Sequence, residues 1–448
     1  MTVDAPDASI GSGMGSSASG VGLPGDVATA GEPRDVAEPG TFDGQRRNVW
    51  LLGIDMAVFA MGLGALGQLT VIPLFVSKLT DNPLAIGAVA AAIQFGWLPQ
   101  ILVAGPVERS ARKWPWVTRY SFLERFPTLV LAFAALAVPY AGPWVVVLVY
   151  LCCFAQTAFG GLVVAPWLDV IARVVPSRLR GRFFGVSNTV GALLGAATAA
   201  AVAPLLDWLP FPYGFAACFG VAALIYGLGL IPIFMVREPP GPPPRPPRPF
   251  REQLGELPAV LTADRPFRQF MLGLCIAALA TMSGGFVVVY GVTVLGAPDD
   301  MAGWYTASLF VAQMVANTVL GWLGDRHGFA AVGRVMALAT AGVGVVALAA
   351  PSATWLLLAF VLLGVVQSGS MLARLSGPIE YAPPERRPSY VALAFGIFGP
   401  CSAVAPLVGG QIVATLGYGW LFGVSALIGL LAVPVLGRGA RAPARSAR

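Results

Sequence analysis

The stretch GWLGDRHGFA, residues 321–330, places Asp325, Arg326 and the only histidine of the chain between two long apolar runs. A second stretch, AGPVERSARK at residues 104–113, carries charged residues at nearly the same spacing in the first half of the chain. Its charged residues are Glu108, Arg109, Arg112 and Lys113. Two similar charged clusters, each flanked by apolar sequence, indicate a chain built from two related halves.

The composition indicates an integral membrane protein. Hydrophobic residues make up 56% of the chain and charged residues 11%, and the mean hydropathy is +0.75. Apolar stretches of about 20 residues, long enough for a helix to cross a bilayer, recur along the sequence. We therefore expect an all-α membrane fold with twelve transmembrane helices. The expected spans are 49–77, 84–107, 116–139, 144–171, 183–206, 213–236, 268–295, 302–324, 331–350, 354–377, 389–415 and 418–437.

The distribution of positive charge predicts the orientation in the membrane, because Arg and Lys are enriched in cytoplasmic loops. Here they occur on alternate connections, including the two that hold the charged clusters. We expect a multi-pass protein of the plasma (inner) membrane with both termini in the cytoplasm. The same bias accounts for the net charge of +6. The expected partner of the basic loops is therefore the lipid bilayer with its acidic headgroups, and not nucleic acid.

Two six-helix halves and a linker account for the organisation of the chain. A proline run between the halves excludes helix, and the apolar residues after it have the spacing of a short amphipathic helix. A second repeat, VPSRLRGRFFG and PPERRPSYVAL, follows the fourth and tenth spans. The expected segments are a disordered cytoplasmic tail (1–47), the N-terminal half (48–236), the linker (237–267), the C-terminal half (268–437) and a cytoplasmic tail (438–448).

Over residues 48–437 the chain resembles the major facilitator superfamily (MFS). That family has the pattern G-x-L-A-D-R-x-G-R-K between its second and third helices. The second cluster fits it at Gly321, Leu323, Asp325, Arg326 and Gly328. The first cluster fits at Arg109, Arg112 and Lys113 and departs from it at Ala104, Glu108 and Ala111.

The resemblance implies that these clusters are cytoplasmic gates. A carboxylate near a helix N-terminus is stabilised by the helix dipole, and arginines bridge to carboxylates of neighbouring helices. By resemblance, Glu108 would cap the eleventh helix and Asp325 the fifth helix.

The fourth span contributes a further acidic residue, Asp169, to the expected gate. By resemblance, Asp169 would pair with Arg112 and with Arg180 or Arg182. The alternative is that all these charges only set the orientation of the loops.

Ionisable residues inside the spans are costly in hydrocarbon and usually face a cavity or a partner. Asp55 of the first span and Arg374 of the tenth would line the central cavity by resemblance. Asp55 is a candidate proton carrier, and the alternatives are a structural pair with an arginine or snorkelling. Glu124, with Arg119 or Arg125, is expected to be structural.

Neutral polar residues of the spans could bind substrate or join helices by hydrogen bonds. Gln313 and Asn317 share one helix face because they are four residues apart, and Gln367, Ser370 and Arg374 share another. Further candidates are Gln68, Gln94, Gln156 and Gln411.

Several functions do not fit the sequence. Neither of the two lysines, Lys78 and Lys113, follows a P-loop glycine pattern, so ATP hydrolysis by that route is not expected. The single histidine, His327, lies in a loop and cannot serve as the base of an intramembrane serine hydrolase. The five cysteines lie in apolar spans without metal-site spacing. We expect no enzymatic activity, cofactor or metal.

The predicted function is secondary transport of a small organic solute by alternating access, with export preferred. Uptake by symport is the first alternative, and a non-transporting receptor or scaffold with this fold is the second. The fifth span lacks the GPxxGG antiporter pattern, and a partial likeness, APLVGG at 405–410, occurs on the eleventh span. Protons are a candidate coupling ion, with sodium or no coupling left open.

Overall fold

A computed structural model describes residues 44–100, 110, 112–142, 144–239, 261–383 and 387–438. These residues belong to one compact unit of the chain. Within them the secondary structure is helical and contains no β-strand, which confirms the predicted all-α class.

The helices before the linker correspond to the first six expected spans. They are α1 (Gln45–Leu66), α2 (Val71–Leu79), α3 (Pro83–Phe95), α5 (Trp114–Leu136), α6 (Val138–Ala141), α7 (Trp144–Val174), α8 (Ser177–Val202), α9 (Leu205–Trp208) and α10 (Tyr213–Met235).

The helices after the linker correspond to the last six expected spans. They are α12 (Arg265–Ala280), η1 (Thr281–Ser283), α13 (Phe286–Thr293), α14 (Met301–His327), α15 (Phe329–Ala349), η2 (Ala353–Trp355), α16 (Leu356–Leu375), α17 (Gly377–Tyr381), α18 (Arg387–Leu416) and α19 (Tyr418–Arg438).

Ten helices in the described part of the chain are long and apolar enough to cross a membrane. The two expected spans outside this set have identifiable differences. α3 has only 13 residues, and its expected continuation from residue 101 lies outside the described residues. α5 has 23 residues but includes three charged side chains, those of Arg119, Glu124 and Arg125.

The first expected span is interrupted in its middle. α1 ends at Leu66, and Gly67 takes a φ of +55°, in the left-handed region that favours glycine. A Cβ atom at Gly67 would lie 2.5 Å from Val71 Cγ2 and 2.7 Å from Thr70 Oγ1. The chain therefore turns at Gly67 and resumes as α2.

The seventh expected span is interrupted at the corresponding place. α12 passes into the 3₁₀ turn η1, and Gly284 and Gly285 separate that turn from α13. Backbone polar groups freed by such interruptions need a polar surrounding inside a bundle, so both interruptions are expected to face a cavity.

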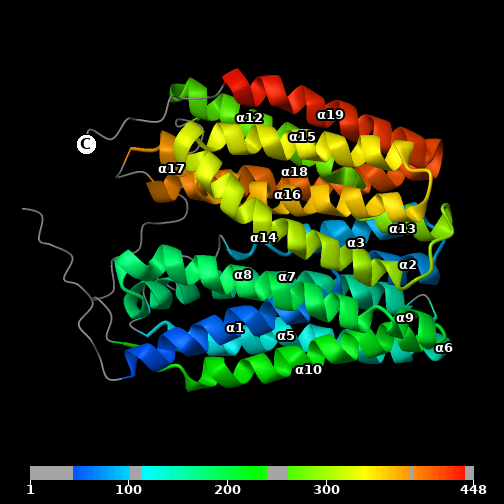
Figure 1. The fold of residues 1–448 in the computed structure, drawn as a ribbon, viewed down its shortest axis with the longest axis horizontal. Coiled ribbons are helices and arrows are strands. Elements are labelled where there is room, and N and C mark those ends of the chain that lie inside the picture. Colours follow the sequence, from blue (N-terminus) through cyan, green and yellow to red (C-terminus); the bar gives the residue numbers. More distant parts are fainter. Residues whose placement is uncertain are drawn as a thin grey trace, which may run out of the picture. The chain divides into compact units, whose positions relative to one another are not determined.

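Within each group, helices pack against helices distant in the sequence as well as against their neighbours in the chain. α1 packs against α8 and α10, and α5 packs against α7 and α10, whereas α15 packs against α16 and α19. Between the groups, α3 packs against α18, and α14 packs against α8 (Figure 1). At these contacts a Cβ on Gly87 would collide with the carbonyl of Pro406, and one on Gly303 with Ala203, so both glycines permit close helix approach.

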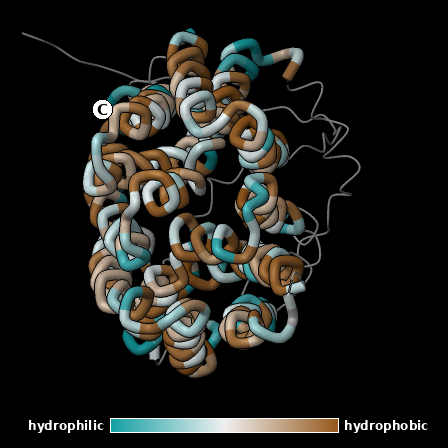
Figure 2. Tube along the Cα trace, turned by 90° about the vertical axis from the view of Figure 1, so that its right-hand side faces the viewer, coloured by the Kyte–Doolittle hydropathy of each residue, from teal (hydrophilic) through white to brown (hydrophobic). Residues whose placement is uncertain are grey.

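The outward surface of the bundle is apolar. Large side chains such as Phe133, Leu224 and Leu431 are more than half exposed, while Phe75 and Phe360 are fully buried. Viewed along the helices, hydrophobic residues occur all around the bundle (Figure 2). An apolar exterior of this kind suits a lipid surrounding, which agrees with the expected multi-pass membrane protein.

The expected domain boundaries remain predictions. The tails up to residue 43 and from 439 onward, and most of the linker, 240–260, lie outside the described residues.

Candidate functional site

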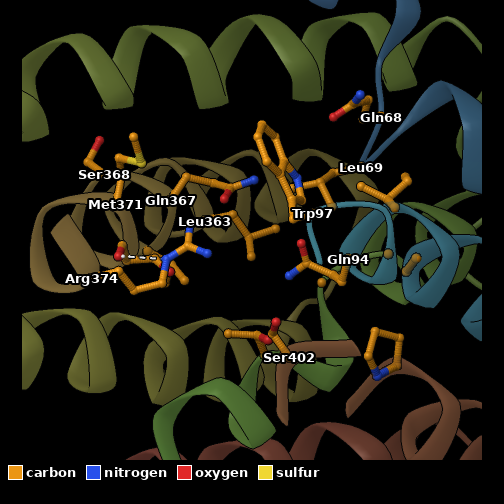
Figure 3. Close-up of a pocket in the computed structure, with 18 of the residues that line it drawn as sticks. Gln68, Leu69, Gln94, Trp97, Leu363, Gln367, Ser368, Met371, Arg374 and Ser402 are labelled. Carbon is orange, nitrogen blue, oxygen red and sulfur yellow. Dashed lines mark hydrogen bonds between the residues drawn. The ribbon is translucent and has the colours of Figure 1, made fainter. Parts of the chain in front are cut away.

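A central cavity of about 380 Å³ lies where the two helix interruptions meet α3, α14, α16 and α18 (Figure 3). Gln68 and Leu69 line it from the first interruption, and Thr281, Gly284 and Gly285 line it from the second. The two helix interruptions thus lie at one site, although they are far apart in the sequence.

Seven of the candidate residues line this space together: Gln68, Gln94, Gln313, Asn317, Gln367, Ser370 and Arg374. In Figure 3 the side chains of Arg374, Gln367 and Gln94 reach toward the same open space.

Trp97 and Ser402 are among the lining residues that were not predicted. The position of Trp97, three residues beyond Gln94 on the same expected helix, is the signal that would have indicated it. No comparable signal distinguishes Ser402 from the other small residues of α18.

The cavity wall continues into the N-terminal helices through amide side chains. Gln68 donates a hydrogen bond from Nε2 to Gln156 Oε1 at 3.2 Å, and Gln156 donates from Nε2 to Thr128 Oγ1 at 3.2 Å. Gln156 and Thr128 are buried. Gln156 therefore joins helices and also connects the cavity to the interior of the N-terminal group.

Arg374 is half-buried at one end of the cavity. Its Nε donates to the carbonyl of Ser370 at 3.2 Å, and its guanidinium carbon lies 4.7 Å and 5.3 Å from the ring centroids of Phe398 and Phe395. Among the described residues Arg374 forms no ion pair with a carboxylate. Aromatic faces stabilise the cation in part, but they leave its charge unneutralised.

Asp55 has a different surrounding from the one expected for a cavity residue. Arg125 Nη2 lies 2.6 Å from Asp55 Oδ1, and both side chains are buried. Arg125 also donates from Nη1 to the carbonyl of Tyr226 at 3.3 Å and lies over the ring of Phe59. Asp55 is not among the residues that line the cavity. This geometry favours the structural pair over the proton carrier for Asp55.

Glu124 lies beside this pair and is also buried, with 8% of its surface exposed. It approaches the backbone of α7, where a Cβ on Gly160 would lie 2.5 Å from Glu124 Oε1. In the described part of the chain Glu124 has no ion-pair partner of its own, because Arg125 points to Asp55. The expected pairing of Glu124 with Arg119 or Arg125 does not occur among the described ion pairs.

The first charged cluster forms a network at the ends of α5 and α7. Asp169 pairs with Lys113 at 3.2 Å and with Arg173, and Arg173 also lies 3.4 Å from Glu238. Glu238 accepts hydrogen bonds from the backbone N–H groups of Lys113 at 2.7 Å and Trp114 at 3.1 Å. Glu238 thereby caps the N-terminus of α5.

The pairing of Asp169 differs from the expectation. Arg173 is one helical turn beyond Asp169 and reaches it within α7, whereas Arg112 is exposed. Arg180 folds back onto the end of α7 and donates to the carbonyls of Val175 and Ala172. Arg182 is exposed, and Glu108 and Arg109 lie outside the described residues.

The second charged cluster ends α14 and begins α15. Gly328 takes a φ of +78°, and a Cβ there would lie 2.7 Å from Glu380 Oε1. Glu380 Oε2 accepts a hydrogen bond from the N–H of Phe329 at 2.8 Å and so caps α15. Arg326 stacks on the ring of Trp322 at 4.7 Å.

The expected contact of Asp325 with the fifth helix is absent from the hydrogen bonds and ion pairs of the described residues. The Asp325 side chain is exposed, and a Cβ on Gly321 would meet no atom within 4 Å. The end of α14 therefore stands free of α8 in this conformation.

The capping residues Glu238 and Glu380 were not predicted. Each follows the end of a long apolar helix and caps the helix that begins just after a charged cluster, α5 or α15. The signal that could have indicated them is an acidic residue beside a basic loop.

The comparison with protein families identifies the fold. The family model of the Major Facilitator Superfamily matches residues 270–447, which include the second charged cluster and its glycines. The matched segment covers most of the C-terminal group of helices, and this part of the chain is similar to the major facilitator superfamily.

Similar solved structures cover most of this chain. A mutant of the nucleoside transporter NupG is 12% identical, covers 88% of this chain and 100% of its own, and has a TM-score of 0.70. The D-xylose-proton symporter is 15% identical over 89% and 97% of the two chains, with a TM-score of 0.60. A POT family transporter in complex with 5-aminolevulinic acid is 12% identical over 89% and 96%, with a TM-score of 0.64.

One curated relative is the MFS thioclapurine efflux transporter tcpA of Claviceps purpurea (strain 20.1), 25% identical over 135 residues. The match spans 30% of this chain and about a quarter, 25%, of the relative. The family model and these neighbours describe transporters, and their likeness to this chain shows its fold. With ten candidate membrane spans in its described part, the chain has the architecture of a multi-pass membrane protein.

The two groups of helices are in contact at one end of the bundle. Lys78, in the last turn of α2, pairs with Asp299 before α14 at 2.9 Å. The hydroxyls of Thr70 and Thr306 share a hydrogen bond that is buried inside the bundle. Both contacts join helices of the N-terminal group to helices of the C-terminal group and hold the described helices together at this end.

The opposite end of the bundle is spread apart. Asn317, Thr318 and Val319 are exposed in succession on α14, so both its outer and its inner face are uncovered there. On α8, a Cβ on Gly181 or Gly185 would meet no atom within 4 Å. The cavity therefore opens toward the end that carries the two charged clusters.

Proposed function

We propose that this protein is a secondary transporter that moves a small organic solute across the plasma membrane by alternating access. The observation that carries the proposal is the polar cavity at which the interrupted first and seventh spans meet. Discontinuous helices at matching places in two halves are a common substrate site of secondary transporters. A volume of about 380 Å³ suits a small organic molecule.

The orientation of the charges supports a cytoplasm-facing state. The open end carries Arg112, Arg173 and Arg326, and basic residues collect on the cytoplasmic side. In the opposite state the cytoplasmic ends would meet, and Asp325 would gain its contact with α8. We propose that Gly321, Asp325, Arg326 and Gly328, with Glu108, Arg109 and Arg112 of the first cluster, form the cytoplasmic gate.

Export is the direction that we propose. The efflux transporter of Claviceps purpurea, similar over part of the chain, supports this direction. Uptake by symport is the alternative, and the sign of the measured solute gradient distinguishes the two.

Protons are the coupling ion that we propose, with Glu124 as the carrier. Asp55 and Glu124 are the buried acids of the described spans, and Asp55 is neutralised by Arg125. The groups facing Glu124 are Asp55 and Arg125 and, from α10, the Tyr226 hydroxyl, which has no hydrogen-bond partner among the described residues. An ionised Glu124 would add an unbalanced negative charge in a low-dielectric interior, which is costly.

The test compares the wild type with a blocked cavity. Gln367→Trp fills the cavity, and Leu431→Trp adds the same ring on the lipid-facing surface, where Leu431 is 54% exposed. Cells expressing each form at equal membrane levels are compared by untargeted mass spectrometry of internal and external solutes. The wild type and Leu431→Trp should deplete the same internal solutes, and Gln367→Trp should not. Identical solute distributions in all three would contradict transport through this cavity.

A further inference from the structure

Arg374 distinguishes the cavity from a merely polar one. It is the only charged residue among the described residues that line the cavity, and the other polar groups are amides and hydroxyls. From these observations we infer that the transported solute carries an anionic group, a carboxylate or a phosphate, that binds Arg374. This inference rests on the proposed function and names the class of its substrate.

The free hydrogen-bonding capacity of Arg374 supports an external anion. Its Nε donates to the carbonyl of Ser370, and this is the hydrogen bond that Arg374 makes within the described part of the chain. Its two terminal nitrogens make no hydrogen bond or ion pair recorded within the described part of the chain, and the guanidinium points into the cavity (Figure 3). A guanidinium with two free terminal nitrogens matches the paired oxygens of a carboxylate or phosphate.

None of the described carboxylates supplies a counter-charge to Arg374. Arg125 neutralises Asp55, and Asp169 lies in the network of Lys113 and Arg173. An arginine in the membrane interior without a counter-charge is costly, because its hydration is lost without replacement. Phe395 and Phe398 compensate only in part, and an anion in the cavity would supply the missing charge.

The other residues that line the cavity indicate the chemistry of the rest of the solute. Gln94, Gln367 and Ser402 offer neutral donors and acceptors around the space in front of Arg374 (Figure 3). Trp97, Leu363 and Met371 provide an apolar wall. The cavity therefore fits an organic anion with an apolar or aromatic part, rather than a small inorganic ion.

Three variants test this inference. Arg374→Met removes the charge and keeps much of the length of the side chain. Arg374→Lys keeps the charge but lacks the planar guanidinium. Arg119→Met is the control, because it replaces an exposed arginine outside the cavity. The probe is the total soluble metabolite extract of the expressing cells, with Gln367→Trp as the blocked reference. Monodisperse elution and an unchanged melting temperature of each purified variant confirm that it folds.

The expected result is that solutes whose distribution depends on the open cavity are anionic at pH 7. Their transport should fall about tenfold or more in Arg374→Met, which loses both the charge and the bidentate contact. It should fall less in Arg374→Lys, which loses the bidentate contact but keeps the charge, and it should not fall in Arg119→Met.

Two other results separate this inference from the proposed function. Cavity-dependent solutes that are neutral or cationic, or that Arg374→Met still transports at the wild-type rate, would overturn the anion inference and leave transport standing. If no solute depends on Gln367, the proposed function fails and the inference fails with it.

Discussion

At the residue scale, the buried pair of Asp55 and Arg125 ties α1 to α5. Its charges lie 2.6 Å apart and away from the cavity, so its first role is in stability. Burying two charges is costly in itself, and removing one partner leaves the other uncompensated, which costs about 3–5 kcal/mol.

We predict that Asp55→Ala lowers the stability of the protein strongly, and that Arg125→Met in the same chain restores much of it. The melting temperature in detergent measures both effects, and the double variant serves as the control because it removes the uncompensated charge. A single variant as stable as the wild type would contradict a structural pair.

Replacing Glu124 should have a different effect, because Glu124 has no described ion-pair partner that its removal would leave as an uncompensated buried charge. Glu124→Gln keeps the shape and removes the titration, so we expect unchanged or higher stability and transport that no longer responds to a pH gradient. The measurement is solute flux into vesicles at several imposed gradients. Asp81→Asn, at an exposed acid, is the control and should keep the response. A pH response retained by Glu124→Gln would exclude Glu124 as the carrier.

At the element scale, the interruption of the first span depends on one glycine. Gly67→Ala would place a Cβ in the left-handed region, which costs about 1–2 kcal/mol, and against Val71 as well. We predict reduced stability. We also predict reduced transport, because this turn holds Gln68 and Leu69 at the cavity and the variant would displace it.

Gly220→Ala is the matched control for this change. Gly220 lies within α10, and a Cβ there would meet no atom within 4 Å. Alanine is the better helix former, so the control should gain up to about 1 kcal/mol in stability. Equal melting temperatures for the two variants would argue against a strained, glycine-dependent turn.

The loop between α13 and α14 controls the closed end. Burial, and then the nearby carboxylate of Asp207, raise the pKa of Asp300 in this state, and Asp300 Oδ1 has no partner among the described residues. A raised pKa in the closed state means that protonation favours closure. Closure is therefore favoured at low pH and weakens as the pH rises through the pKa of the closed state.

We predict that Asp300→Asn keeps this end closed at all pH values, whereas Lys78→Met opens it more often. The Lys78 and Asp299 pair is partly exposed, so its loss should shift the populations only a few-fold. Labelling of a cysteine at Gln68 from the Lys78 side, in a background without the native cysteines, reports the opening. Labelling independent of pH in the wild type would contradict the role of Asp300.

At the scale of the whole molecule, the conformation determines which gate contacts exist. Asp325 is exposed here because the ends of α8 and α14 are apart, although the same helices pack closely at Gly303. We predict that Asp325→Asn leaves the melting temperature of this state unchanged but slows transport. Flux equal to the wild type at equal membrane levels would remove Asp325 from the gate.

Much of the architecture could be predicted from local sequence. Apolar length and loop charge predict helices crossing a membrane, and the glycines and charges around Asp325 indicate the family pattern. Gln313 with Asn317, and Gln367 with Arg374, were assigned to shared helix faces by spacing alone, and all four line the cavity. Interruptions such as the one at Gly67 were not predicted, because hydropathy hardly changes across them.

By itself, the sequence determined the all-helical membrane class, the positions of the spans and the likeness of the two charged clusters, since these depend on composition and short-range periodicity. Only the tertiary structure decided which ionisable residues meet. It directs Asp55 to Arg125 and away from the cavity, pairs Asp169 with Lys113 and Arg173, and leaves Arg374 in the cavity without a described counter-charge. The physical reason is that a charge in a membrane protein takes its role from its nearest neighbours, and helix packing brings those neighbours from distant parts of the chain.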